Sequence, residues 1–222
     1  MRKLFFSNGS PFARKVRIVL HEKGLDYERD VQDRVRPVEE IASLNPALAV
    51  PVLVDRGLTL SDGDLTLFDS DLILAYLFET YPENAPDAPR DPPLAPWMAR
   101  PERRWEDART LAAIRAFADS VVNLRLMGRD GVTPETSAYM ARQAARVQRC
   151  LDWLEARAAP EGFAPGWFSA MDIAFLCPVA FGERRGVLEW RGRPRLEALF
   201  DRLQAGPSVA ATPVDGVPPK KG

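Results

Sequence analysis

The residues near the start of the chain that could do chemistry are grouped around Ser10. A short apolar run, Leu4 to Phe6, stops at Ser7-Asn8-Gly9, and apolar residues restart with helical spacing after Pro11. This pattern predicts a strand, a turn and a helix. Ser10 stands at the N-cap position, where its oxygen can accept a bond from a free backbone N–H. Because a helix N-terminus in contact with solvent also attracts anions, the hydroxyl is either a cap or a group for binding a ligand.

Few other residues offer nucleophilic or metal chemistry. The chain of 222 residues holds one histidine and two cysteines. His21 lies three turns from Ser10 on the same predicted helix, about 16 Å along its axis, so we expect it at the surface and not as a base. Cys150 and Cys177 lie in helical contexts far apart in the sequence, which argues against a disulfide framework or a zinc site. We expect both to be core residues without a basic neighbour, and we predict no metal site.

Composition narrows the choice of partners and compartment. The net charge is −1, with 46% hydrophobic and 27% charged residues, which gives no sign of a nucleic-acid partner. No apolar stretch approaches the roughly 18 residues that a membrane span needs, and the N-terminus has no signal-peptide pattern. We therefore expect a cytoplasmic protein that does not associate with a membrane.

The first 80 residues alternate between strand and helix patterns. Residues 27–31 predict a second strand, parallel to the first, and residues 37–41 a short helix. Pro51 begins an apolar strand, where it must mark an edge, a bulge or a cis turn. A hairpin strand at 65–68 follows, and Asp69-Ser70-Asp71 then opens an apolar helix. The order β-α-β-α-β-β-α predicts a compact α/β unit with a mixed sheet.

A proline-rich stretch divides the chain. We assign residues 1–81 to the α/β domain, 82–101 to a linker, 102–207 to an all-helical domain and 208–222 to a loosely held tail. The helices of the second domain are predicted at 105–126, 134–157, 169–181 and 194–204.

One helix of this second domain has a marked start. Ser169 and Asp172 form a capping box, which we expect to matter for folding and not for chemistry. Pro178 is expected to interrupt the helix that the box begins.

Taken in order, five segments resemble the motifs of the cytosolic glutathione S-transferase family, of a bacterial, tau- or beta-like kind with a catalytic serine. These segments are Ser10-Pro11-Phe12 with Arg14 to Arg17, Asn45-Pro46 with Val50 to Leu53, Asp69-Ser70, Ser169 to Asp172, and Gly206 to Thr212. The resemblance implies a thioredoxin-like N-terminal domain with a mixed four-stranded sheet, an all-α C-terminal domain, a homodimer, and glutathione bound between the domains.

The same resemblance assigns roles to residues. Ser10 would donate a hydrogen bond to the glutathione sulfur, and Phe12 would help to wall the cleft. Val50, before a cis Pro51, would pair its backbone with the peptide like an added strand. Ser70 would hold the γ-glutamyl carboxylate, and Asp69 would lie near the amino group.

The family implies transfer of glutathione to small hydrophobic electrophiles, typical of detoxification. Met98, Trp105 and Arg109 are candidates for the electrophile pocket, although packing in the core or at the domain interface explains their helical spacing equally well. Ala49 stands where the family often has a basic residue for the glycyl carboxylate. This departure favours a second hypothesis, a non-catalytic binding or regulatory protein on the same fold. A glutathione-dependent disulfide reductase has little support, because no cysteine precedes Cys150.

Overall fold

A computed structural model describes residues 1–32, 38–60, 63–81, 100–164 and 168–215. The chain folds as two compact units. The first unit comprises Met1–Asp91 together with Pro207–Gly222, and the second unit comprises Pro92–Gly206. The end of the chain therefore belongs to the same unit as its beginning.

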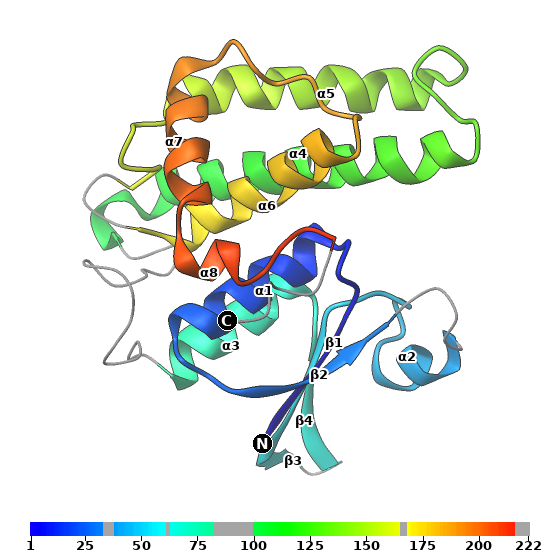
Figure 1. The fold of residues 1–222 in the computed structure, drawn as a ribbon, viewed down its shortest axis with the longest axis vertical. Helices are drawn as coiled ribbons and strands as arrows, with labels where there is room; N and C mark the ends of the chain where they lie inside the picture. Colours follow the sequence, from blue (N-terminus) through cyan, green and yellow to red (C-terminus); the bar gives the residue numbers. More distant parts are fainter. Residues whose placement is uncertain (33–37, 61–62, 82–99, 165–167, 216–222) are drawn as a thin grey trace, which may run out of the picture. The chain divides into compact units, whose positions relative to one another are not determined.

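A four-stranded mixed sheet forms the first unit, as the sequence predicts (Figure 1). Its strands are β1 (Arg2–Phe6), β2 (Tyr27–Val31), β3 (Val52–Leu60) and β4 (Gly63–Phe68), in the order β2-β1-β3-β4. Strand β1 pairs parallel with β2 and antiparallel with β3, and β3 and β4 form the expected hairpin. The thioredoxin-like fold with its mixed sheet is thus confirmed.

Alternation along the strands gives the sheet two apolar faces. Phe5, Val52 and Val54 form one cluster with Ile41 of helix α2 (Val38–Leu44). Successive side chains of a strand point to opposite faces, so the equally buried neighbours of these residues face the other way. Helices α1 (Pro11–Glu22) and α3 (Ser70–Thr80) contact each other, and α3 packs on β3 and β4. The helices that begin at Ser10 and Asp69 are therefore fixed against one sheet.

The end of the chain is ordered against α1, so the expectation of a loosely held tail from residue 208 is wrong for residues 208–212. Helix α8 (Pro207–Ala210) contacts α1, and Ser208, Val209 and Thr212 are all buried. Their partners are 186 to 198 residues earlier in the chain. The proline-rich composition of this stretch suggested a free tail because composition carries no information about such distant partners.

The second unit is helical in the part that the structure describes. A short 3₁₀ helix (Pro101–Arg103) leads into α4 (Arg104–Arg129), which is followed by α5 (Ala138–Glu155), α6 (Ala170–Arg184) and α7 (Pro194–Gln204). Pro101, assigned to the linker, is thus the first residue of the 3₁₀ helix. Helix α5 begins four residues later than expected, because Thr133 and Thr136 bond each other in a turn and Ser137 caps the helix.

Helix α6 begins at the predicted capping box but does not stop at Pro178. The helix continues to Arg184, and every residue from Ala170 to Gly182 is buried. A proline in a helix removes one backbone hydrogen bond at a cost of about 3 kcal/mol. Packing on all sides of α6 offsets that cost, so the expected interruption is wrong.

The capping box of α6 is tied to a neighbouring turn by Asp172. The fully buried carboxylate accepts hydrogen bonds from the N–H of Ser169 (2.8 Å), the hydroxyl of Ser169 (3.0 Å) and the N–H of Phe163 (2.9 Å). Burial raises the pKa of Asp172 to about 6, and these three bonds oppose the rise.

Candidate functional site

Strand register brings the predicted site segments to one edge of the sheet. Val52, at the start of β3, pairs with Phe5 near the end of β1 and with Phe68 at the end of β4. Ser10 therefore follows the end of β1, Val50 precedes the start of β3, and Asp69-Ser70 follows the end of β4. Neighbouring strands lie about 4.8 Å apart, so the three segments meet at this edge although they are up to 60 residues apart in the sequence.

Ser10 is a cap whose proton remains available. Its side-chain oxygen accepts a bond from the N–H of Ala13 at 3.2 Å, and its own N–H donates to the carbonyl of Ser7. A serine hydroxyl has one donor and two acceptor positions. Capping uses an acceptor position, so the hydroxyl can still donate to a ligand. The two interpretations of Ser10 left open by the sequence are compatible. Phe12, two residues on, is half-buried.

The loop before β3 presents backbone groups at the same edge. The Val50–Pro51 peptide bond is cis, one of the three arrangements expected at Pro51. Asn45 braces this loop from within, because its amide donates to the carbonyl of Ala49 (2.8 Å) and accepts from the N–H of Ala47 (2.9 Å). Among the described residues, nothing bonds the N–H or C=O of Val50. These two groups are free to pair with an extended peptide.

The start of α3 offers a place for an anion. Asp69 has φ +73°, in the region that favours glycine, and its Oδ1 accepts from the N–H groups of Asp71 (2.6 Å) and Leu72 (3.3 Å). Ser70 is 5% exposed, and within the described ranges neither its N–H nor its hydroxyl has a hydrogen-bond partner. Strained backbone of this kind clusters at ligand sites, and free donors at a helix N-terminus suit a carboxylate.

An ion pair that the sequence analysis missed joins the two helices of this site. The ammonium of Lys15 on α1 bonds the carboxylate of Asp71 on α3, and both side chains are largely buried. Lys15 follows Ser10 by five residues, and Asp71 directly follows Ser70. A lysine and an acid 56 residues apart carry no local signal of pairing, so only the fold could reveal this contact.

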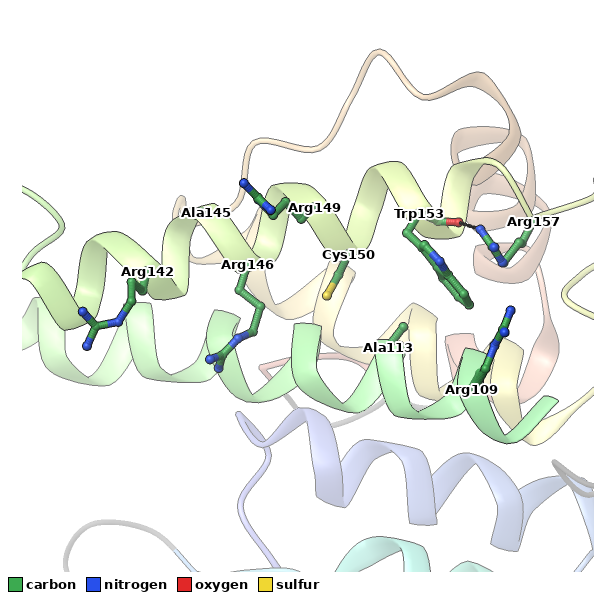
Figure 2. Close-up of a pocket in the computed structure, with 9 residues that line it drawn as sticks. All are labelled: Arg109, Ala113, Arg142, Ala145, Arg146, Arg149, Cys150, Trp153 and Arg157. Carbon is green, nitrogen blue, oxygen red and sulfur yellow. Dashed lines mark hydrogen bonds between the residues drawn. The ribbon is translucent and has the colours of Figure 1, made fainter. Parts of the chain in front are cut away.

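A separate hollow of about 970 Å³ lies between α4 and α5 in the second unit (Figure 2). Most of the residues that line the hollow have basic or small side chains, and one has an indole ring. They are Arg109, Ala113, Arg142, Ala145, Arg146, Arg149, Cys150, Trp153 and Arg157. The Arg157 guanidinium lies 3.5 Å from the centre of the Trp153 ring and donates to the Trp153 carbonyl. The Cys150 sulfur points into the hollow (Figure 2).

Two of the three electrophile-pocket candidates lie in the described structure. Met98 lies outside the described residues. Trp105 and Arg109 are both on α4, where Trp105 is 74% exposed and only Arg109 lines the hollow. The expectation that no cysteine has a basic neighbour is wrong for Cys150. Burial raises the pKa of this thiol, and the charge of Arg146 opposes the rise. Cys177 and His21 match their predictions, one buried and one exposed.

Comparison with known proteins supports what the register and the free donors indicate. Residues 4–85 match the family model "Glutathione S-transferase, N-terminal domain". A glutathione S-transferase of Methylobacterium radiotolerans, solved in complex with glutathione sulfonate, is 30% identical, with 97% of this chain and 95% of that chain covered and a TM-score of 0.73. The chain belongs to the glutathione S-transferase family.

Other members of the glutathione S-transferase family extend the comparison. A glutathione transferase family member from Pseudomonas fluorescens Pf-5, with bound glutathione, is 27% identical over 99% of this chain and 100% of that chain, with a TM-score of 0.75. A stringent starvation protein A homolog of Pasteurella multocida is 40% identical over 93 residues, which cover 42% of this chain but only 37% of the homolog.

Neither a membrane span nor a metal cluster occurs among the described residues. None of the helices there combines the length and apolar content needed to cross a membrane. Nor do histidine, cysteine, aspartate and glutamate side chains gather there in threes as a metal site would require.

Proposed function

We propose that this protein is a serine-type glutathione transferase of a tau- or beta-like kind, which activates the glutathione thiol through Ser10 for attack on small hydrophobic electrophiles. One observation carries the proposal. The donors of Ser10 and Ser70 and the backbone groups of Val50 lie at one sheet edge, and the described chain leaves them without partners. Glutathione, with a thiol, an extended peptide and a terminal carboxylate, has groups complementary to all three.

The chemistry at Ser10 requires only stabilisation of a thiolate. A free thiol has a pKa near 8.5, and each unit of depression corresponds to about 1.4 kcal/mol. A hydrogen bond to a charged group contributes roughly 1.5–3 kcal/mol, and the positive end of α1 adds to it. The serine therefore needs no basic partner, because the proton leaves to solvent and the thiolate is the nucleophile.

The rest of the ligand would lie along the same edge. Val50 would pair its N–H and C=O with the peptide, next to the cis Pro51. The Ser70 hydroxyl and N–H would take the γ-glutamyl carboxylate. Asp69 uses Oδ1 for capping, which leaves Oδ2 for the ligand's amino group. Phe12 would pack beside the sulfur.

The direct test of Ser10 is to titrate the bound thiolate by its ultraviolet absorbance. Ser10→Ala should raise the apparent pKa of bound glutathione by about one to two units, because it removes one charge-assisted hydrogen bond. Ser10→Thr keeps a hydroxyl and should keep a low value. Ser7→Ala, in the same turn, is the control for local disturbance. Equal apparent pKa values in wild type and Ser10→Ala would refute the role of Ser10.

A second candidate function is a non-catalytic binding or regulatory protein on the same fold. Two observations favour it: Ala49 in place of a basic residue, and the match to a protein named for stringent starvation. Calorimetry with glutathione separates the candidates. Binding at millimolar glutathione or below supports the transferase, and no detectable heat at millimolar ligand supports the alternative.

The remaining features of the proposal follow from family membership. We propose a cytoplasmic homodimer in detoxification, in which residues 1–81 bind glutathione and the helical residues 102–207 help to bind the electrophile. Trp105 and Arg109 of α4, with Met98, would contribute to the electrophile pocket. Sedimentation velocity measures the oligomeric state. Turnover of a panel of aryl halides and epoxides by wild type and Trp105→Ala measures the contribution of α4.

A further inference from the structure

Arg14 joins the first turn of α1 to the end of the chain. Its Nε donates to the carbonyl of Thr212 at 2.6 Å, and its Nη2 donates to the carbonyl of Val209 at 3.3 Å. The residue is only 3% exposed. Its backbone N–H donates to the carbonyl of Ser10 at 3.0 Å, so Arg14 follows Ser10 by one helical turn. Arg14 thus bonds both Ser10, the cap of α1, and residues near the end of the chain.

Residues 207–212, the C-terminal segment, run antiparallel to α1. Ser208 donates its hydroxyl to the carboxylate of Glu22 at the end of α1, whereas Thr212 accepts from Arg14 near its start. The Thr212 hydroxyl donates to the Ser208 carbonyl at 2.9 Å, which holds the segment in a compact turn. In Figure 1 the red segment follows α1 toward the end at which the β1–α1 loop enters.

The charge of Arg14 is balanced by dipoles and not by an anion. Among the described residues no carboxylate forms an ion pair with Arg14, and its buried Nη1 has no hydrogen-bond partner. The carbonyl groups of Val209 and Thr212 are neutral acceptors, so they hold the guanidinium without cancelling its charge. Helical side chains lean toward the N-terminus, which directs this charge toward the Ser10 end.

The other charged groups around α1 do not neutralise this end. Glu22 lies at the far end of the helix, where Ser208 binds it. Asp71 of α3 is paired with Lys15. From the sheet, Arg29 lies with Arg17 over the Phe6 ring. Burial lowers the pKa of Arg17, Tyr27 opposes this change, and the charges of Arg29 and Arg14 add to it. Asp69 at the start of α3 lies at the same sheet edge as Ser10 and has no cationic partner among the described residues, and its Oδ1 accepts from the N–H groups of Asp71 and Leu72.

We propose that Arg14 is a positioning residue through which the C-terminal segment increases the acidity of the glutathione thiol at Ser10. The segment fixes the guanidinium near the first turn of α1, where an uncancelled positive charge favours a thiolate over a thiol. This inference rests on the proposed function. The inference assigns residues 207–212 a part in the chemistry at Ser10.

The test compares the apparent pKa of glutathione bound to variants that separate charge from hydrogen bonding. Arg14→Gln can still donate to a carbonyl but carries no charge, and it should raise the thiol pKa by about one unit, which is about a tenfold smaller ionisation constant. Arg14→Lys keeps the charge and should stay within about 0.3 units of wild type. Arg195→Gln, on the exposed side of α7, is the control and should change nothing.

Several results would overturn the proposal. An unchanged thiol pKa in Arg14→Gln, with Ser10→Ala still shifted, refutes the role of Arg14 and leaves the proposed function intact. Equal shifts in the Gln and Lys variants show that the two-carbonyl geometry matters and the charge does not, which also refutes it. Absence of glutathione binding in wild type refutes both proposals together.

A truncation keeps the proposal falsifiable if Arg14→Gln does not fold. Ending the chain after Gly206 removes the carbonyl groups of Val209 and Thr212 and frees the guanidinium to enter solvent, where its charge is screened. The thiol pKa should then rise in the same direction as in Arg14→Gln. A wild-type pKa in the folded truncated protein contradicts control by the C-terminal segment.

Discussion

Replacing Gly162 by alanine tests how firmly Asp172 is held in the second unit. Gly162 has φ +127°, a backbone conformation that residues other than glycine rarely adopt. A Cβ at this position would lie 2.8 Å from Oδ1 and 2.9 Å from Oδ2 of Asp172. The carboxylate is fully buried and holds the N–H groups of Phe163 and Ser169, so it cannot move aside without breaking those bonds.

The expected cost of Gly162→Ala has two parts. Backbone strain contributes about 1–3 kcal/mol. Moving the carboxylate leaves at least one buried N–H unsatisfied, which adds about 1–3 kcal/mol. We therefore expect a loss of about 2–6 kcal/mol in the free energy of unfolding, measured by urea denaturation with linear extrapolation.

Gly192→Ala is the matched control for this substitution. Gly192 has φ +90°, but a Cβ there would have no atom within 4 Å. It should therefore lose only the strain contribution of about 1–3 kcal/mol. If the two variants lose the same free energy of unfolding, the Asp172 carboxylate is not anchored as described, and the reasoning fails.

Three further outcomes are expected. The pKa of Asp172, raised to about 6, lies above its unfolded value, so its contribution to stability is full below about pH 4 and is lost as the pH rises through 6; carboxyl NMR should show a midpoint near 6, and a midpoint below 4 would contradict this. Because burial raises the pKa of Cys150, iodoacetamide should label it more slowly than a free thiol at pH 8, whereas buried Cys177 should react only after unfolding; labelling of Cys150 at the rate of free cysteine would disagree. A double-mutant cycle with Lys15→Met and Asp71→Asn should give a coupling of about 1–2 kcal/mol in unfolding, and a coupling near zero would show that this ion pair does not tie α1 to α3.

The local sequence pattern predicted the helices and strands of the fold well, because capping residues, glycines and prolines mark the ends of most of them. Pro194 and Gln204 bound α7 as expected, and the order of strands and helices in the first unit is the predicted one. The misses have tertiary causes. Packing on every side carries α6 through Pro178, and contacts with α1 order the end of the chain. Neither cause is visible within a short window of sequence.

In the candidate site, too, local pattern predicted some residues, whereas others depend on tertiary contacts. Ser10 and Asp69 were found because serine and aspartate before apolar helices are strong local signals. Their meeting with Val50 depends on strand pairing, which the resemblance to a family supplied and local pattern could not. The Lys15–Asp71 pair and the bonds of Arg14 to the last residues were missed, since nothing in the sequence around Arg14 points to Thr212.

The bond between Arg14 and Thr212 also sets an order of events during synthesis. The two residues are 198 positions apart, so at about 5–20 residues per second α1 waits about 10–40 s for its last contact. Until then, the guanidinium and the Glu22 carboxylate lack the C-terminal groups that bind them in the finished protein. A ribosome-bound chain should therefore protect the amides of α1 from hydrogen exchange less than the released protein does. The first unit can be completed only after the whole second unit has been synthesised, because it contains residues on both sides of that unit.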